Sequence, residues 1–183
     1  PQTEALACRA VGLLPDQGRA VDLCTGAGAV AATMRLRIPT ATVIGIDVDP
    51  VSAACARRNG VPTLVGDLAA PLRVRGDLDV VTAVAPYVPT GELQWLPTDV
   101  QRNEPQLALD GGADGLEVLR RVIASAAELL RPGGGVLVEG GGEQDRTLGP
   151  TLVEHGFGGA QPWCDDDGDL RGIAARLDPD RSG

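Results

Sequence analysis

The sequence predicts an α/β fold in which helices cover both faces of a mostly parallel sheet. Three observations lead to this prediction. The chain has 183 residues, of which 43% are hydrophobic, which suits one domain with a sizeable core. Short apolar stretches of strand length alternate with stretches in which apolar residues recur at helical spacing. Turns rich in glycine, proline and aspartate separate the two kinds of stretch. We therefore expect a single domain over residues 1–183.

Each expected element carries a local signal. Thr3 suits the cap of the first helix, Pro50 the start of the third helix, and Gly60 its end. Residues 88–114 form a long irregular connection, which favours a functional role over packing. In chain order, the sequence predicts a helix at 3–14, a strand at 18–24, a helix at 29–37, a strand at 41–49, a helix at 51–59, strands at 61–68 and 77–85, a helix at 115–130, a strand at 136–140, a helix at 144–155, and strands at 160–164 and 172–177.

Composition disfavours several classes of function. The chain has 16 basic and 25 acidic residues and a net charge of −9, so we expect no nucleic-acid partner. The cysteines form no CxxC pair and the single histidine, His155, is far from them in sequence, so we expect no metal site. No apolar stretch approaches the length of a membrane span and no signal peptide is visible, which predicts a cytoplasmic protein with no membrane partner. The four cysteines are Cys8, Cys24, Cys55 and Cys164.

A glycine loop joins the first predicted strand to the following helix. In "VDLCTGAGAVAA", Gly26 and Gly28 allow a tight turn and a close approach of a ligand to the backbone. Asp47 ends the next strand, where a carboxylate suits the two hydroxyls of an adenosine ribose. Two nucleoside cofactors share this pattern, the nicotinamide dinucleotides and S-adenosylmethionine (SAM).

Acidic strand ends favour SAM of the two cofactors. Asp22 directly precedes the glycine loop, where a pyrophosphate gains nothing from a negative charge. SAM carries a sulfonium and an ammonium group instead, and both suit an acidic surrounding. Asp67, at the end of the third strand, is placed to accept a hydrogen bond from the adenine amino group, with Leu68 against the ring.

Six segments occur in an order that resembles a known family. They are "DLCTGAGAVA", "GIDVDPVSAACARRN", "GDL", "APYVP", "EPQLALDGGADGLEVLRR" and "LRPGGGVLVEGGGEQ". The chain resembles the SAM-dependent glutamine-N5 methyltransferases of the HemK/PrmC family, which modify peptide release factors. The resemblance runs from about Pro1 to about Gln144 and implies a Rossmann-like, seven-stranded class I SAM-dependent methyltransferase fold. The N-terminal helical domain of the family, which helps to hold the release factor, is absent from this chain.

The resemblance also assigns a cofactor site. It places the methionine part of SAM in the loop Cys24–Gly28, the ribose on Asp47, and the adenine on Asp67 and Leu68. Cys24 departs from the family, which usually has glycine there. The residues implied to bind the cofactor are Thr3, Asp22, Cys24, Thr25, Gly26, Ala27, Gly28, Asp47, Val48, Asp67 and Leu68.

The resemblance places the catalytic segment after the fourth strand. Family members carry Asn-Pro-Pro-Tyr, and the matching residues here are Val84, Ala85, Pro86 and Tyr87. The asparagine oxygen and the next backbone carbonyl accept hydrogen bonds from the two hydrogens of the substrate amide. These two hydrogen bonds hold the amide nitrogen in line with the methyl group. Val84 has no such acceptor.

The substitution at Val84 leaves the methyl acceptor open. The leading expectation is an enzyme that transfers a methyl group, without a metal, to a glutamine amide of a release factor or another protein. The alternatives are a small-molecule N- or O-methyltransferase and a SAM-binding module with impaired catalysis. A nicotinamide-dependent oxidoreductase is a further alternative, against which Asp22 and the ALDGG motif argue.

Overall fold

The computed structural model describes residues 2–73 and 75–180 of the chain. It confirms every helix and strand that the sequence predicts, with changes at their ends. In chain order the elements are α1 (Gln2–Leu13), β1 (Arg19–Leu23), α2 (Ala29–Arg37), β2 (Thr42–Asp47), α3 (Pro50–Arg58), β3 (Thr63–Val65), β4 (Leu78–Ala83), the 3-10 helix η1 (Thr90–Trp95), α4 (Thr98–Asn103), the 3-10 helix η2 (Gln106–Ala108), α5 (Glu117–Leu129), β5 (Leu130–Glu139), α6 (Gln144–Glu154), β6 (Phe157–Cys164) and β7 (Leu170–Leu177).

The strands form one seven-stranded sheet in the order β3-β2-β1-β4-β5-β7-β6. The pairs from β3 to β5 are parallel, and β7 runs antiparallel to both of its neighbours. This is the arrangement expected of the class I SAM-dependent methyltransferase fold. Because the chain order reverses between β1 and β4, the carboxyl ends of these two strands meet at a switch point, where such sheets bind ligands.

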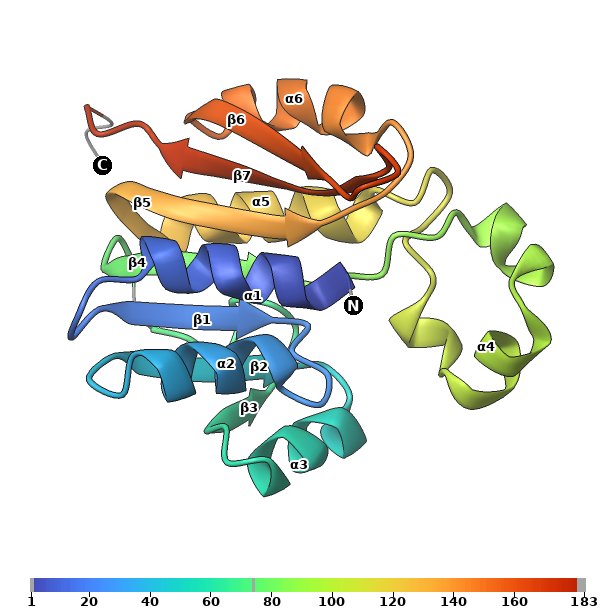
Figure 1. The fold of residues 1–183 in the computed structure, drawn as a ribbon, viewed down its shortest axis with the longest axis horizontal. Helices are drawn as coiled ribbons and strands as arrows, with labels where there is room; N and C mark the ends of the chain where they lie inside the picture. The colour runs from blue at the N-terminus through green and yellow to red at the C-terminus, as the bar shows by residue number, and fades with distance from the viewer. Residues whose placement is uncertain (1, 74, 181–183) are drawn as a thin grey trace.

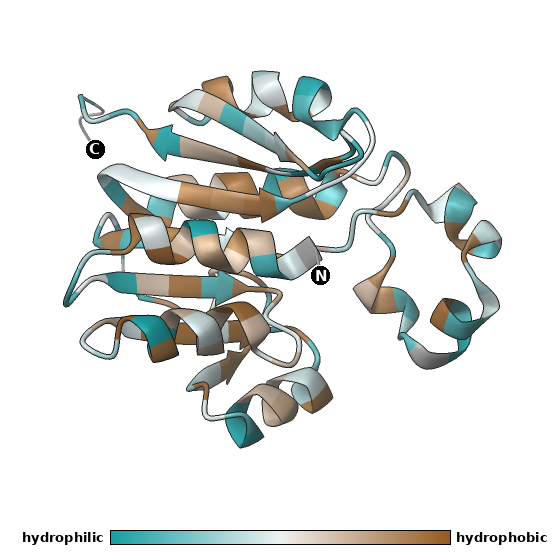
Figure 2. Ribbon diagram, in the orientation of Figure 1, coloured by the Kyte–Doolittle hydropathy of each residue, from teal (hydrophilic) through white to brown (hydrophobic). Residues whose placement is uncertain are grey.

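Helices cover both faces of the sheet (Figure 1). One core lies between the sheet and α1, α2 and α3, and a second core lies between the sheet and α5 and α6. Successive strand residues alternate between the cores, as the pleat requires. Val80 faces the first core and Val81 the second. Figure 2 shows apolar residues along the strands, and helices that carry both apolar and polar residues.

Two segments differ from the prediction. The fifth strand was predicted to begin at residue 136, but β5 already begins at Leu130. Leu130 pairs with Leu78, and the register then shifts so that Gly135 pairs with Val80, which places the glycines in a bulge. Residues 88–114 were predicted as irregular, but they contain η1, α4 and η2 and project from the carboxyl edge of the sheet (Figure 1).

The stability of the fold depends on the stripe of α5 that faces the sheet. We predict that Leu119→Ala lowers the free energy of unfolding by about 2–5 kcal/mol, because Leu119 is fully buried there and its truncation leaves a cavity. Leu36→Ala on α2 is the control, since Leu36 is 77% exposed and its loss should change stability by no more than about 0.5 kcal/mol. Urea titration followed by circular dichroism measures both values, and equal effects would contradict this packing.

Candidate functional site

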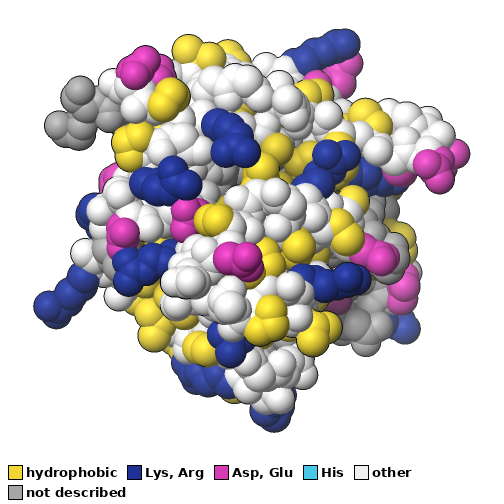
Figure 3. Space-filling view, turned by 60° about the vertical axis from the view of Figure 1, so that its left-hand side comes forward, with side chains coloured by type: hydrophobic (Ala, Val, Ile, Leu, Met, Phe, Trp, Pro, Cys, Tyr) yellow, Lys and Arg dark blue, Asp and Glu magenta, His cyan; other side chains and the backbone are white. Residues whose placement is uncertain are grey.

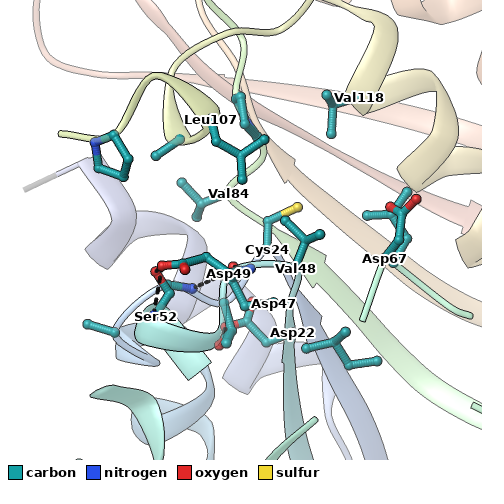
Figure 4. Close-up of a pocket in the computed structure, with 18 of the residues that line it drawn as sticks. Asp22, Cys24, Asp47, Val48, Asp49, Ser52, Asp67, Val84, Leu107 and Val118 are labelled. Atoms are coloured by element: carbon teal, nitrogen blue, oxygen red, sulfur yellow. Dashed lines mark hydrogen bonds between the residues drawn. The ribbon is translucent and has the colours of Figure 1, made fainter. Parts of the chain in front are cut away.

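A cavity of about 890 Å³ opens at the carboxyl edge of the sheet. Its walls come from the ends of β1 and β2, the residues after β3 and β4, the start of α1, helix α5, and the segment 105–110 (Figure 4). The volume lies in the range of pockets that hold small ligands and cofactors. The predicted site residues that line it are Thr3, Asp22, Cys24, Thr25, Gly26, Ala27, Asp47, Val48, Asp67, Leu68, Val84 and Pro86.

The carboxylate of Asp22 lies buried at the floor of the cavity, 1% exposed. It accepts hydrogen bonds from the Thr25 hydroxyl at 2.6 Å and from the Thr82 hydroxyl at 2.7 Å. Burial, with a smaller contribution from the charge of Asp47, raises the pKa of Asp22 to about 6, although the two hydroxyls oppose the shift. The site therefore holds a carboxylate whose charge a nearby cation would stabilise.

The glycine turn after β1 presents its backbone to the cavity. Gly26 and Gly28 both have positive φ, 55° and 85°. A Cβ on Gly26 would meet nothing within 4 Å, whereas one on Gly28 would lie 3.0 Å from Val61 and 3.1 Å from Ala56. Gly26 thus leaves open space beside the cavity. Gly28 does not line it and instead allows α2 to approach α3 closely.

Cys24 occupies a backbone conformation that favours glycine. Its φ is 53°, and side chains in this region cost about 1 kcal/mol or more. The sulfur lies among the residues that line the cavity (Figure 4). Burial raises the pKa of the Cys24 thiol to about 12, with additional contributions from Asp47, Asp22 and Asp67. The thiol therefore stays neutral, and it narrows the part of the cavity beside the glycine turn.

The carboxylate of Asp47 is fixed at the end of β2 by two backbone donors. The Gly26 N–H donates to its Oδ2 at 2.7 Å, and the Asp49 N–H donates to its Oδ1 at 2.9 Å. Each oxygen keeps a second lone pair. Asp49 in turn caps α3, because its carboxylate accepts from the Val51 and Ser52 N–H groups. The adjacent Val48 is 51% exposed and provides an apolar surface at the cavity wall.

Asp67 and Leu68 close the cavity on the β3 side. The Asp67 carboxylate pairs with the Arg121 guanidinium of α5 at 2.5 Å, and both side chains are about half exposed. Arg121 was not among the predicted site residues, because an arginine on an amphipathic helix has no distinctive signal without the strand end that it faces. Leu68 is only 7% exposed, so most of its side chain packs in the core behind the cavity.

The four residues predicted as catalytic divide into two pairs. Val84 and Pro86 line the cavity, whereas Ala85 is buried in the core and does not line it. Tyr87 also lies outside the cavity lining and packs partly buried against that core. Burial raises the pKa of the Tyr87 phenol, and the charge of Glu139 raises it further. The Gln144 amide donates to the Tyr87 carbonyl at 3.2 Å, which ties this segment to α6.

The ALDGG motif folds against the segment that follows β4. The Val88 N–H donates to the Leu109 carbonyl at 3.0 Å, and the Gly111 N–H donates to the Val88 carbonyl at 2.8 Å. A Cβ on Gly111 would lie 2.8 Å from the Tyr87 Cα, and one on Gly115 would lie 2.5 Å from the Tyr87 carbonyl. These glycines are therefore required for the close approach that shapes the mouth of the cavity.

The buried residue Glu139 ends β5 and is 4% exposed. Thr3 lines the cavity, and its hydroxyl donates to Glu139 Oε2 at 3.1 Å. Burial raises the pKa of the Glu139 carboxyl. Glu139 was not among the predicted site residues, since a glutamate at a strand end looks like an ordinary surface residue until its neighbours are known.

Neither a metal-binding cluster nor a membrane-spanning helix is found in the described residues. Within 2–73 and 75–180, no group of three or more His, Cys, Asp or Glu side chains could hold a metal ion, and no helix is long and apolar enough to cross a membrane. All four cysteines are free thiols. Figure 3 shows arginines scattered among acidic and apolar side chains on the face that it displays.

The raised pKa of Asp22 predicts a pH dependence of stability. Since the folded value of about 6 lies above the ordinary value of 3.8, the folded state binds more protons between these values. The contribution of Asp22 to the free energy of unfolding is therefore fully present below about pH 4 and is lost as the pH rises through 6. We predict that Asp22→Asn flattens this decline by about 1–3 kcal/mol relative to the native chain, measured by urea titration from pH 4 to 7. Parallel curves for the two proteins would contradict the assignment.

Comparison with known proteins gives the family. No family model matches the chain. It is 42% identical over 135 residues to a release factor glutamine methyltransferase of Moorella thermoacetica, covering 69% of this chain and 47% of that protein. It is 36% identical over 155 residues to a 4-amino-L-phenylalanine/4-methylamino-L-phenylalanine methyltransferase of Streptomyces pristinaespiralis, covering 80% and 52%. The chain thus spans about half the length of the curated relatives it matches.

A solved structure supports the same assignment. The release-factor-specific protein-(glutamine-N5) methyltransferase of Alicyclobacillus acidocaldarius matches with a TM-score of 0.58 and 25% identity, over 98% of this chain and 93% of that one. The carboxyl-edge cavity, the glycine turn and the ALDGG motif are in the order and place that the resemblance implies. The chain therefore belongs to the HemK/PrmC-like family of SAM-dependent protein-(glutamine-N5) methyltransferases.

Proposed function

We propose that the chain is a SAM-dependent methyltransferase domain, spanning 1–183, that methylates an amide nitrogen of a protein glutamine in the cytoplasm, with a peptide release factor as its substrate. The observation that carries this proposal is the cavity at the carboxyl edge, where the Gly26 backbone holds the Asp47 carboxylate. Relatives named release factor glutamine methyltransferase support the choice of acceptor.

The cavity residues fit the parts of SAM in order along the sheet. The turn 24–28, with Asp22 beneath it, suits the methionine part, Asp47 suits the ribose hydroxyls, and Asp67 with Leu68 suits the adenine. The open side of Gly26 leaves room for a ligand against the backbone. When bound, SAM supplies a methyl group activated by a sulfonium cation. Asp22 offers this cation a negative charge in a buried setting, where the attraction is little screened.

The methyl acceptor would bind at the end of the cavity beside the segment that follows β4. Val84 and Pro86 form the cavity wall there and contribute no side-chain hydrogen bond to an amide. The backbone carbonyl of Ala85, which the resemblance implies as the second acceptor, belongs to a buried residue that does not line the cavity. A glutamine side chain would lie with its aliphatic stem against Val84 and Leu107, which both line this part of the cavity (Figure 4). We infer that amide methylation in this chain is slow compared with a member that has asparagine at this position.

A second acceptor class is favoured by one observation. The residues Val84 and Leu107 on the acceptor side of the cavity are both apolar, which suits an aromatic ring. One relative is named for methyl transfer to 4-amino-L-phenylalanine. A small aromatic amine is therefore the second candidate for the methyl acceptor. Methyl transfer to such an amine, without methyl transfer to a release factor, would favour it over the glutamine amide.

Cofactor binding tests the domain directly. We predict that S-adenosylhomocysteine binds to the native chain and that Asp47→Ala weakens binding about 30-fold or more, because two charge-assisted hydrogen bonds to the ribose are lost. Asp16→Ala is the control, since Asp16 is exposed and precedes β1 at the opposite edge of the sheet. Isothermal titration calorimetry measures the dissociation constants. The proposal fails when millimolar ligand produces neither heat nor a thermal shift.

Restoring the amide acceptor tests the acceptor class. We predict that Val84→Asn raises methyl transfer to a bacterial release factor about 10²–10³-fold, because the added oxygen holds the amide nitrogen in line with the methyl group. Val84→Leu is the control, since it is of similar size and has no acceptor. Incorporation of radioactive methyl groups, with the modified glutamine located by mass spectrometry, gives the rates. Equal rates for the asparagine and leucine variants would exclude amide chemistry at this position.

A further inference from the structure

The strand ends divide the cavity into a cofactor side and an acceptor side. In the sheet order β3-β2-β1-β4-β5, neighbouring strands lie about 4.8 Å apart. The residues suited to adenine, ribose and methionine end β3, β2 and β1 in turn. The ends of β4 and β5 are next in the row, so the groups there face the position of the methyl group and its acceptor. These ends carry Val84 and Glu139.

Glu139 lies beside Val84 on the same face of the sheet. Ala83 of β4 pairs with Val138 of β5 in a parallel register, so the following residues, Val84 and Glu139, are neighbours. Side chains of paired positions point to the same face. Val84 packs against the core beneath α1, and Glu139 accepts from Thr3 of α1, which agrees with this geometry.

Thr3 connects the Glu139 carboxylate to the cavity through a hydrogen bond. Leu6 and Ala10 of α1 are buried against the sheet, and Thr3 lies on the same helical stripe. Thr3 lines the cavity, and its hydroxyl donates its hydrogen to Glu139. The oxygen lone pairs of the hydroxyl therefore remain to accept a hydrogen from a ligand. Glu139 does not line the cavity and acts through this hydroxyl.

A simple ion pair with a neighbouring residue does not account for the buried carboxylate of Glu139. Arg171 of β7 lowers the pKa of the carboxyl, but the Arg171 guanidinium itself pairs with Asp165 and Asp169. The charge of Glu139 also raises the pKa of the nearby Tyr87 phenol, which therefore stays neutral and supplies no opposite charge. Burying a carboxylate without a dedicated partner is costly, and such groups concentrate at functional sites.

We propose that the Thr3 hydroxyl and the Glu139 carboxylate behind it form the polar end of the acceptor site, receiving the hydrogen bond and then the proton of the acceptor nitrogen in place of the side-chain amide that Val84 lacks. This inference rests on the proposed function. It assigns Thr3 to the acceptor side of the cavity and makes Glu139 a positioning residue, and it applies to a glutamine amide and to an amine alike.

The step balances in atoms and charge. The new bond between nitrogen and the methyl carbon forms as the bond between sulfur and that carbon breaks, and the electron pair of the broken bond stays on sulfur. The nitrogen proton passes to the Thr3 oxygen while the Thr3 proton passes to Glu139. The positive charge on sulfur and the negative charge on Glu139 disappear together, which favours the step in a buried site.

Sinefungin tests this arrangement without turnover. It resembles S-adenosylhomocysteine but carries an amino group at the position of the transferred methyl. We predict that the native chain binds sinefungin about 10-fold more tightly than S-adenosylhomocysteine, because the amino group donates to Thr3 and lies near the charge of Glu139. Glu139→Gln and Thr3→Val should each lower this preference about 5-fold or more and leave the affinity for S-adenosylhomocysteine within twofold. Calorimetry gives both constants.

The control is Glu143→Gln, the same substitution at an exposed residue just before α6, which should keep the full preference. A native chain that binds S-adenosylhomocysteine without preferring sinefungin would overturn the inference alone. So would a preference that survives in both variants, or an equal loss of both ligands in them, which would show a structural role. A native chain that binds neither ligand refutes the proposed function, and the inference with it.

Discussion

The buried carboxylate of Asp22 joins three strands at the point where the cavity opens. It accepts from the Thr82 hydroxyl on β4 and from the Thr25 hydroxyl in the glycine turn, and the Thr25 N–H donates to the Ile46 carbonyl on β2. The ends of β1, β2 and β4 are thereby held in one arrangement. The turn in which Gly26 fixes Asp47 depends on this arrangement, and so does the direction in which the chain leaves β4.

The mouth of the cavity is set by backbone packing. The segment after β4 passes so close to Gly111 and Gly115 that side chains at those positions would collide with Tyr87. Val88 exchanges backbone hydrogen bonds with Leu109 and Gly111, which positions the projecting residues 88–114 over the opening. A motif that reads in the sequence as a family signature is thus explained by steric necessity, and Leu107 of the same segment lines the cavity together with Val84.

The sequence predicted the fold, and most of the strand-end residues that it singled out line the cavity, because both follow from local patterns. Alternating apolar periods specified the strands and helices, and strand-end residues such as Asp47 meet at one edge of any parallel sheet. The prediction was weaker for residues whose role depends on strand register or on a neighbouring element. Glu139 and Arg121 were missed because their roles depend on register and on a facing strand end. The position of Tyr87 behind the cavity depends on glycines more than twenty residues away in the chain.

The central claim is that Asp47 binds the ribose of an adenosyl cofactor at the carboxyl edge of this sheet. A crystal structure of the chain with S-adenosylhomocysteine bound tests it most directly. The account predicts both ribose hydroxyls within about 3.2 Å of the Asp47 carboxylate, with the sulfur beside the turn 24–28. Density for the ligand elsewhere, or an Asp47 side chain turned away from the ribose, would contradict it.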